Sequence, residues 1–146
     1  TYSGHPVACA VALRNIEIFE REGVLENVRE LERVFLEEMT PLKERVEQVG
    51  DARASGALAA LEFVTTKESN APAPAFQYAV YEAALRRGVL GITQRGKWHY
   101  RLQPALTMPP EFFRDSCRRI IDAVDEVAAN PPAEGHVLDT VAESVR

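Results

Sequence analysis

Arg101 is a side chain of this sequence that could bind an anionic small molecule. A guanidinium group can donate two parallel hydrogen bonds to a carboxylate, so it both binds that group and fixes its orientation. Arg101 belongs to a short strand-like run, residues 98–102, in which side chains should alternate between two faces. The alternation places His99 and Arg101 on one face and the aromatic and aliphatic residues on the other. The pattern alone leaves two interpretations open: a ligand-binding arginine, or an arginine that forms an ion pair on the surface.

Lysine and cysteine, the other side chains here that could react covalently, are sparse. The three lysines stand in a charged helical stretch, a polar loop and a turn, at Lys43, Lys67 and Lys97. Cys9 and Cys117 are far apart and lie inside apolar helical patterns. We therefore predict two buried free thiols, as is usual in a reducing cytoplasm. A disulfide or a metal site would require more partners at closer spacing.

Two helices are expected at the start of the chain. Pro6 suits the first turn of a helix over residues 7–22, and Gly23 is a suitable stop. The first half of this helix, residues 7–13, is apolar on all sides, which is typical of a helix buried between two bodies. Apolar residues at spacings of three and four predict a second helix over residues 24–39.

The remaining pattern predicts short strands and two more helices. Gly50-Asp51 is interpreted as a turn, and residues 95–97 as the tip of a hairpin. The expected strands are residues 46–49, 57–64, 89–93 and 98–102, and the expected helices are residues 75–87 and 111–128. This order predicts an α+β domain with a small, mostly antiparallel sheet covered by helices.

Composition excludes several classes of protein. The chain has 146 residues, enough for one domain with a core, and no apolar run approaches the length of a membrane span. The net charge is −5, and basic side chains are scattered among acids, so nucleic acid is not an expected partner. The N-terminus lacks the features of a signal peptide and does not begin with Met, so we expect the chain to start inside a longer protein.

Four stretches resemble those of class III aminotransferases, which depend on pyridoxal 5'-phosphate (PLP). This group contains ornithine, acetylornithine and γ-aminobutyrate aminotransferases and dialkylglycine decarboxylase. Residues 1–10, TYSGHPVACA, resemble the T-[FY]-[SG]-G-[HN]-P-x-[AS]-x-A segment. Residues 49–58, 86–90 and 100–107 resemble V-G-[DE]-V-R-G-x-G-L-M, R-x-G-[LV]-[LI] and [IVF]-R-[FIL]-x-P-[PSA]-L-x, in the family's order. The sequence departs from these patterns at Ala54, Gln103 and Ala105.

The resemblance implies the C-terminal small domain of a fold-type I PLP-dependent transferase. Residues 1–23 would be the segment and long helix that link two domains, and residues 24–129 the small domain. Residues 130–146 would be a tail without a clear counterpart.

The resemblance also implies roles for individual residues. The family's threonine at the position of Thr1 donates a hydrogen bond to the PLP phosphate of the partner subunit in a homodimer, near a helix N-terminus that favours anions. Tyr2 could form a wall of the active-site entrance, and Arg101 would bind the substrate α-carboxylate. Arg53 is interpreted as a structural arginine in a turn, and His5 as a residue that shapes the N-terminal turn.

None of the three lysines has the strand-end context of the family's Schiff-base lysine. We therefore predict that this chain alone is inactive and does not retain PLP, and that a separate large PLP domain completes the enzyme. The whole, cytoplasmic enzyme would transfer an amino group from an amino acid or amine to a 2-oxo acid. Two alternatives stay open: a free-standing α+β binding or regulatory module, and the same fold performing decarboxylation-coupled transamination or aminomutase chemistry.

Overall fold

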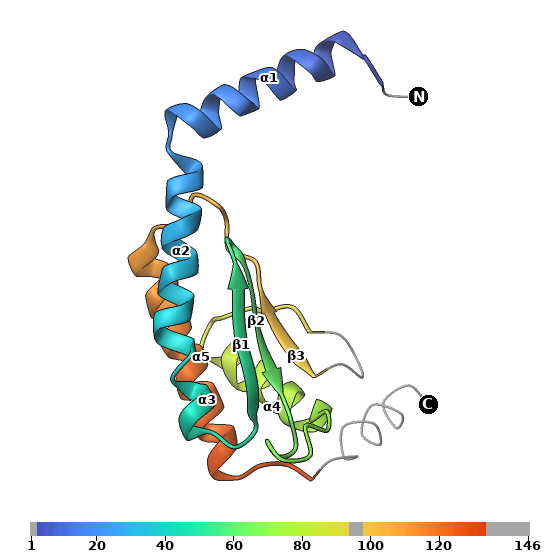
Figure 1. Cartoon of the computed structure of the whole chain (residues 1–146), viewed down its shortest axis with the longest axis vertical. Helices are drawn as coiled ribbons and strands as arrows, with labels where there is room; N and C mark the ends of the chain where they lie inside the picture. The colour runs from blue at the N-terminus through green and yellow to red at the C-terminus, as the bar shows by residue number, and fades with distance from the viewer. Residues whose placement is uncertain (1–2, 94–97, 134–146) are drawn as a thin grey trace.

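The computed structural model describes residues 3–93 and 98–133 of the chain. Its elements are, in order, α1 (Pro6–Arg21), α2 (Val24–Met39), α3 (Leu42–Arg45), β1 (Val49–Ser55), β2 (Leu58–Phe63), α4 (Pro74–Arg86), β3 (His99–Leu102) and α5 (Pro110–Ala129). The three strands form one antiparallel sheet in the order β1-β2-β3 (Figure 1). The predicted α+β class with a small antiparallel sheet is therefore confirmed.

The helices α2 and α4 pack against one face of the sheet, and α5 packs against both of these helices (Figure 1). Side chains of β2 alternate, so that Ala59, Leu61 and Phe63 are buried while Ala60 and Glu62 are partly exposed. Within residues 3–93 and 98–133, no helix packs on the second face of the sheet. We call this second face, on which Ala60 and Glu62 lie, the open face.

The core between the sheet and the helices is apolar and closely packed. Phe35 from α2, Leu61 from β2 and Ile120 from α5 are at most 1% exposed. The rings of Phe63 and Phe76 lie 5.3 Å apart, in a tilted arrangement that aromatic pairs favour. Burial of such side chains is the main force that holds the helices on the sheet.

Strand β1 is longer than the sequence pattern predicted. The expected turn at Gly50-Asp51 is wrong, because β1 continues through both residues to Ser55. Gly50 instead lies where the strand register shifts, and a Cβ there would come within 2.8 Å of Val64 Cγ1. The glycine is therefore required by a close contact at a bulge. The turn itself falls at Gly56, whose φ of 58° suits glycine.

The predicted strand over residues 89–93 is also wrong. In the described part of this segment, only Ile92 forms a β-bridge, with Arg101. The two residues exchange backbone hydrogen bonds of 2.8 and 3.0 Å. The hairpin tip predicted over residues 95–97 lies outside the described residues.

Helix α1 projects from the body of the molecule and contacts α2 (Figure 1). Its apolar side chains lie in solvent, since Val7, Val11 and Leu13 are all more than 60% exposed. The helix has the apolar composition of a buried helix, but no described residue covers it. Cys9 is exposed for the same reason, so the prediction that it is buried is wrong, whereas Cys117 is buried as predicted. Among the described helices, none is long and apolar enough to cross a membrane.

An ion-pair cluster joins α2 to α5 around Glu38, whose side chain is 15% exposed. Arg114 donates a hydrogen bond to Glu38, and Arg118 lies 3.3 Å from it. Burial acts to raise the pKa of the Glu38 carboxyl, but the hydrogen bonds and charges of the two arginines together lower it below its usual value.

The pKa shift of Glu38 predicts a dependence of stability on pH. Because the pKa is lowered in the folded state, the stabilisation is present at neutral pH and is lost as acid protonates the carboxylate. Glu38→Gln is expected to lower the free energy of unfolding at pH 7 by about 1 kcal/mol. The difference from the wild type should shrink as the pH falls below the usual range of a glutamate carboxyl, towards the lowered pKa of Glu38 in the folded state. Urea unfolding at several pH values measures this, and a difference that stays constant with pH would contradict it.

Candidate functional site

Arg101 lies on the open face of the sheet, in the central row of cross-strand pairs. Its register partner on β2 is Ala60, and Ala60 pairs in turn with Arg53 on β1. Paired residues in an antiparallel sheet point to the same face, so two arginines flank one small alanine. The predicted alternation of β3 is confirmed, since Tyr100 and Leu102 are buried while Arg101 is only partly so.

The backbone of Arg101 is fixed, but its guanidinium group forms no ion pair with the described residues. Both backbone polar groups of Arg101 bond to Ile92. The Nε atom is buried and has no hydrogen-bond partner within residues 3–93 and 98–133. A buried donor without an acceptor costs about 1–3 kcal/mol, so an acceptor brought by a ligand would recover that energy. The side chain is thus placed to accept an external partner.

A hollow of about 390 Å³ lies beside Arg101. It is lined by all three strands and by Gln103, with Arg53, Leu58 and Ala60 among the lining residues. A space of this size is within the range of small-molecule sites, which begin at about 300 Å³. The hollow combines a positive group with an apolar wall, an arrangement that suits a small molecule carrying one carboxylate.

Arg53 is ion-paired on the same face and lies in strand β1. The prediction that it stands in a turn is therefore wrong. Its Nη1 atom lies 2.6 Å from a carboxylate oxygen of Glu62 and 3.0 Å from one of Asp51. The hydrogen bond to Glu62, and then that to Asp51, raise the pKa of the Arg53 guanidinium. The two arginines of this row therefore differ: one is paired with acids, and the other has no such partner among the described residues.

Two of the three lysines lie in the described part of the chain. Lys43 donates a hydrogen bond of 2.8 Å to Asp51, which raises the pKa of the amine and keeps it protonated. A nucleophilic amine must lose that proton, so Lys43 does not fit covalent attachment of PLP. Lys67 is exposed in the loop that follows β2, and Lys97 lies outside the described residues.

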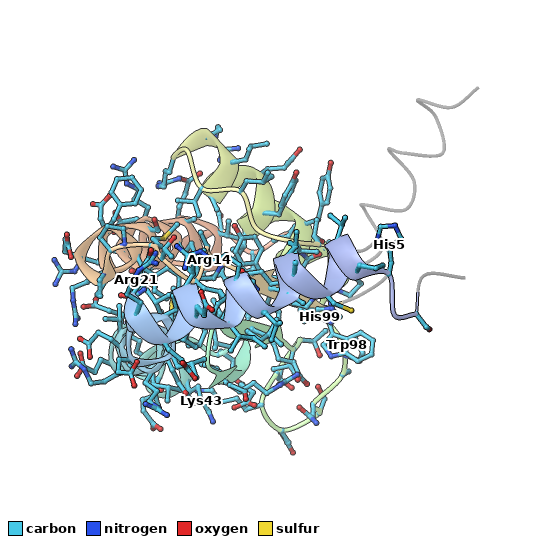
Figure 2. The ribbon with its side chains drawn as sticks, turned by 90° about the horizontal axis from the view of Figure 1, so that it is seen from above. His5, Arg14, Arg21, Lys43, Trp98 and His99 are labelled. Carbon is cyan, nitrogen blue, oxygen red and sulfur yellow. The ribbon has the colours of Figure 1, made fainter. Side chains whose placement is uncertain are left out.

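Thr1 and Tyr2, the predicted phosphate-binding and entrance-wall residues, lie outside the described residues. The chain that follows them forms a turn at Ser3-Gly4, and His5 then precedes α1 without a side-chain cap. Seen from above, α1 extends over the side of the molecule where Trp98 and His99 lie, with His5 at its far end (Figure 2).

Comparison with known proteins assigns the fold and these motifs to one family of transferases. The sequence profile of the aminotransferase class-III family matches residues 1–124. An adenosylmethionine-8-amino-7-oxononanoate aminotransferase of Methanocaldococcus jannaschii is 39% identical over 92 residues, or 61% of this chain and 20% of that protein. The chain therefore belongs to the class III aminotransferases, a family that uses PLP.

Solved transaminase structures share the fold. A transaminase with L-alanine superposes with a TM-score of 0.78 at 26% identity and covers 90% of this chain and 31% of its own. A PLP-bound amine transaminase from an uncultivated Pseudomonas species has a TM-score of 0.71 and 32% identity, covering 90% of this chain and 29% of its own. The chain thus spans less than a third of the length of the proteins that it matches.

Proposed function

We propose that the whole protein is a PLP-dependent aminotransferase that transfers an amino group from an amino acid or amine to a 2-oxo acid. This chain would provide the side of the active site that binds the substrate carboxylate. Membership of the class III family supports the reaction. The observation that carries the role of this chain is the buried Arg101 Nε atom, which lies beside a hollow of suitable size and lacks a hydrogen-bond partner in the described part of the chain.

In this proposal Arg101 binds the α-carboxylate through two parallel hydrogen bonds. The planar guanidinium then fixes the Cα of the substrate in one orientation, because both carboxylate oxygens are held. The apolar wall formed by Leu58 and Ala60 would contact the substrate carbon chain. The α-carboxylate indicates that one substrate is an α-amino acid or 2-oxo acid.

The remaining groups would come from elsewhere in the complete protein. PLP, when bound, supplies the electron sink for the reaction. Thr1 would donate a hydrogen bond to its phosphate in the partner subunit of a homodimer, and Tyr2 would line the entrance. A large PLP domain would contribute the lysine that attaches the cofactor. The complete protein would be cytoplasmic. In this chain, residues 1–23 would form the linking segment, residues 24–129 the small domain and residues 130–146 a tail.

The proposal also accounts for the uncovered helix α1. An apolar helix in solvent is unfavourable, so a covering body is expected in the complete protein. The free-standing binding module, which the sequence left open, would leave Val7, Val11 and Leu13 in water.

The proposal predicts that this chain alone lacks activity. With PLP, L-alanine and 2-oxoglutarate, the 146-residue chain is expected to form no pyruvate above the protein-free control. The complete polypeptide, assayed in the same way over a panel of amino donors, is expected to transfer an amino group. Pyruvate formation by the chain alone would contradict the predicted inactivity. Failure of the complete polypeptide with every amino donor would contradict the proposed function.

A further inference from the structure

We propose that Arg53 is a positioning residue, which holds the Glu62 carboxylate at strand β1 and so prevents it from pairing with Arg101. Arg101 then stays free for the carboxylate of the substrate. This inference rests on the proposed role of Arg101. It assigns a specificity-determining function to an ion pair at the β1 side of the hollow, where Arg53 is a lining residue, and this ion pair does not contact the substrate carboxylate.

The register of the sheet puts Glu62 within reach of both arginines. Arg53 and Arg101 flank Ala60, and Glu62 follows two residues later on the same face of β2. Glu62 is therefore a diagonal neighbour of each arginine. Diagonal neighbours in an antiparallel sheet are roughly 7–8 Å apart, a distance that long side chains span. Glu62 could reach either guanidinium group.

The structure shows which arginine Glu62 selects. Its carboxylate lies 2.6 Å from Arg53 Nη1, and no ion pair of Arg101 is present among the described residues. Asp51 holds the same Nη1 atom at 3.0 Å and is itself bonded to Lys43 at 2.8 Å. These four side chains form a line of alternating charges from α3 across β1 to β2, which ends at Glu62.

This line of charges explains why Glu62 stays on the β1 side. Arg53 is drawn toward β1 by Asp51, and Asp51 is fixed there by Lys43. This line of two cations and two anions is neutral overall. Glu62 would therefore gain little electrostatic stabilisation by leaving Arg53 for Arg101. Arg101 is left as the guanidinium on this face that forms no ion pair with an acid among the described residues, which is the state that an incoming carboxylate requires.

Loss of Arg53 should turn Glu62 into a competitor of the substrate. The Glu62 side chain is only 25% exposed, so its unpaired charge would be poorly solvated and would favour a new partner. Arg101 is the other arginine that is a diagonal neighbour of Glu62 on this face. A partly exposed ion pair of this kind is expected to weaken carboxylate binding about fivefold. Substrates without a carboxylate would not meet this competition, so the loss should be specific to carboxylate substrates.

The test uses the complete polypeptide with PLP and two matched amino donors. L-alanine and propan-2-amine differ only in that a methyl group replaces the carboxylate. The first half of the reaction is followed in single turnovers by the absorbance of the cofactor, at several donor concentrations. Arg53→Gln is expected to raise the L-alanine concentration for half-maximal rate about fivefold. Because Arg53 also lines the hollow, a small change common to both donors is expected, and the measured quantity is the ratio of the half-maximal concentrations of L-alanine and propan-2-amine.

Removal of the competing charge provides the decisive control. In the double variant R53Q/E62Q, the L-alanine concentration for half-maximal rate is expected to return to within about twofold of the wild-type concentration. The reason is that an amide cannot form an ion pair with Arg101. A merely structural role of Arg53 would affect both donors equally and would not be rescued by a second substitution. Either of those results would overturn the inference.

Two further variants separate the possible failures. Arg53→Met keeps the apolar stem of the side chain and carries the same expectation, should R53Q not fold. Arg101→Leu tests the proposed function itself. If R101L leaves the L-alanine concentration for half-maximal rate unchanged, the assignment of Arg101 as the carboxylate-binding residue is wrong. If R101L weakens L-alanine binding while R53Q and R53M have no effect, only the positioning role of Arg53 is rejected.

Discussion

Replacing Arg101 by leucine is expected to raise the L-alanine concentration needed for half-maximal rate by about 100-fold in the complete enzyme. Two charge-assisted hydrogen bonds to the carboxylate would be lost, together worth about 3 kcal/mol, which corresponds to that factor. Propan-2-amine has no carboxylate, and leucine retains an apolar contact. The propan-2-amine concentration for half-maximal rate is therefore expected to change by less than about threefold. Single-turnover measurements with both donors give the two values directly.

Arg101→Lys is the matched control, because it keeps the positive charge and removes the planar arrangement of hydrogen-bond donors. Lysine keeps the positive charge but cannot donate two hydrogen bonds in a fixed plane, so a loss intermediate between the wild type and R101L is expected. An equal loss for both donors in R101L would instead indicate damage to the fold. Unchanged use of L-alanine would mean that another group binds the carboxylate.

The helices and the face of Arg101 could be predicted from local sequence. Periodic apolar residues defined α2 and α5, whose observed bounds differ from the expected ones by no more than a residue or two. Alternation over residues 98–102 separated Arg101 from Tyr100 and Leu102, and burial confirms it. These features depend on neighbours in the sequence, which is why a pattern alone is sufficient for them.

The partners of Arg101 across the sheet could not be predicted in this way. Gly50 was interpreted as a turn, although it serves a close contact with Val64, and so β1 was placed too early in the chain. Because strand register is set by the turn, the misplaced turn meant that the pairing of Arg53 with Ala60 could not be predicted. Glu62 was missed for the same reason. Alternation along β2 would have placed it on the open face, but not beside an arginine.

A substitution at Gly91 is expected to destabilise the fold more than Glu38→Gln does. A Cβ at Gly91 would lie 2.1 Å from Tyr100 Cζ and 2.5 Å from its hydroxyl oxygen. Tyr100 is fully buried in the core, so its ring can move away only by displacing its neighbours. Gly91→Ala should therefore lower the free energy of unfolding by about 3 kcal/mol, as measured by urea unfolding.

The same clash should affect Arg101, because the segment that carries Gly91 is bonded to it. Ile92 forms both backbone hydrogen bonds to Arg101, so a shift of this segment away from Tyr100 would strain them. Tyr100→Leu removes the ring atoms involved, and Gly91→Ala added to that variant is expected to cost less than about 1 kcal/mol. A similar cost in both backgrounds would show that the tyrosine ring is not the obstacle. The link between this contact and the orientation of Arg101 would then fail.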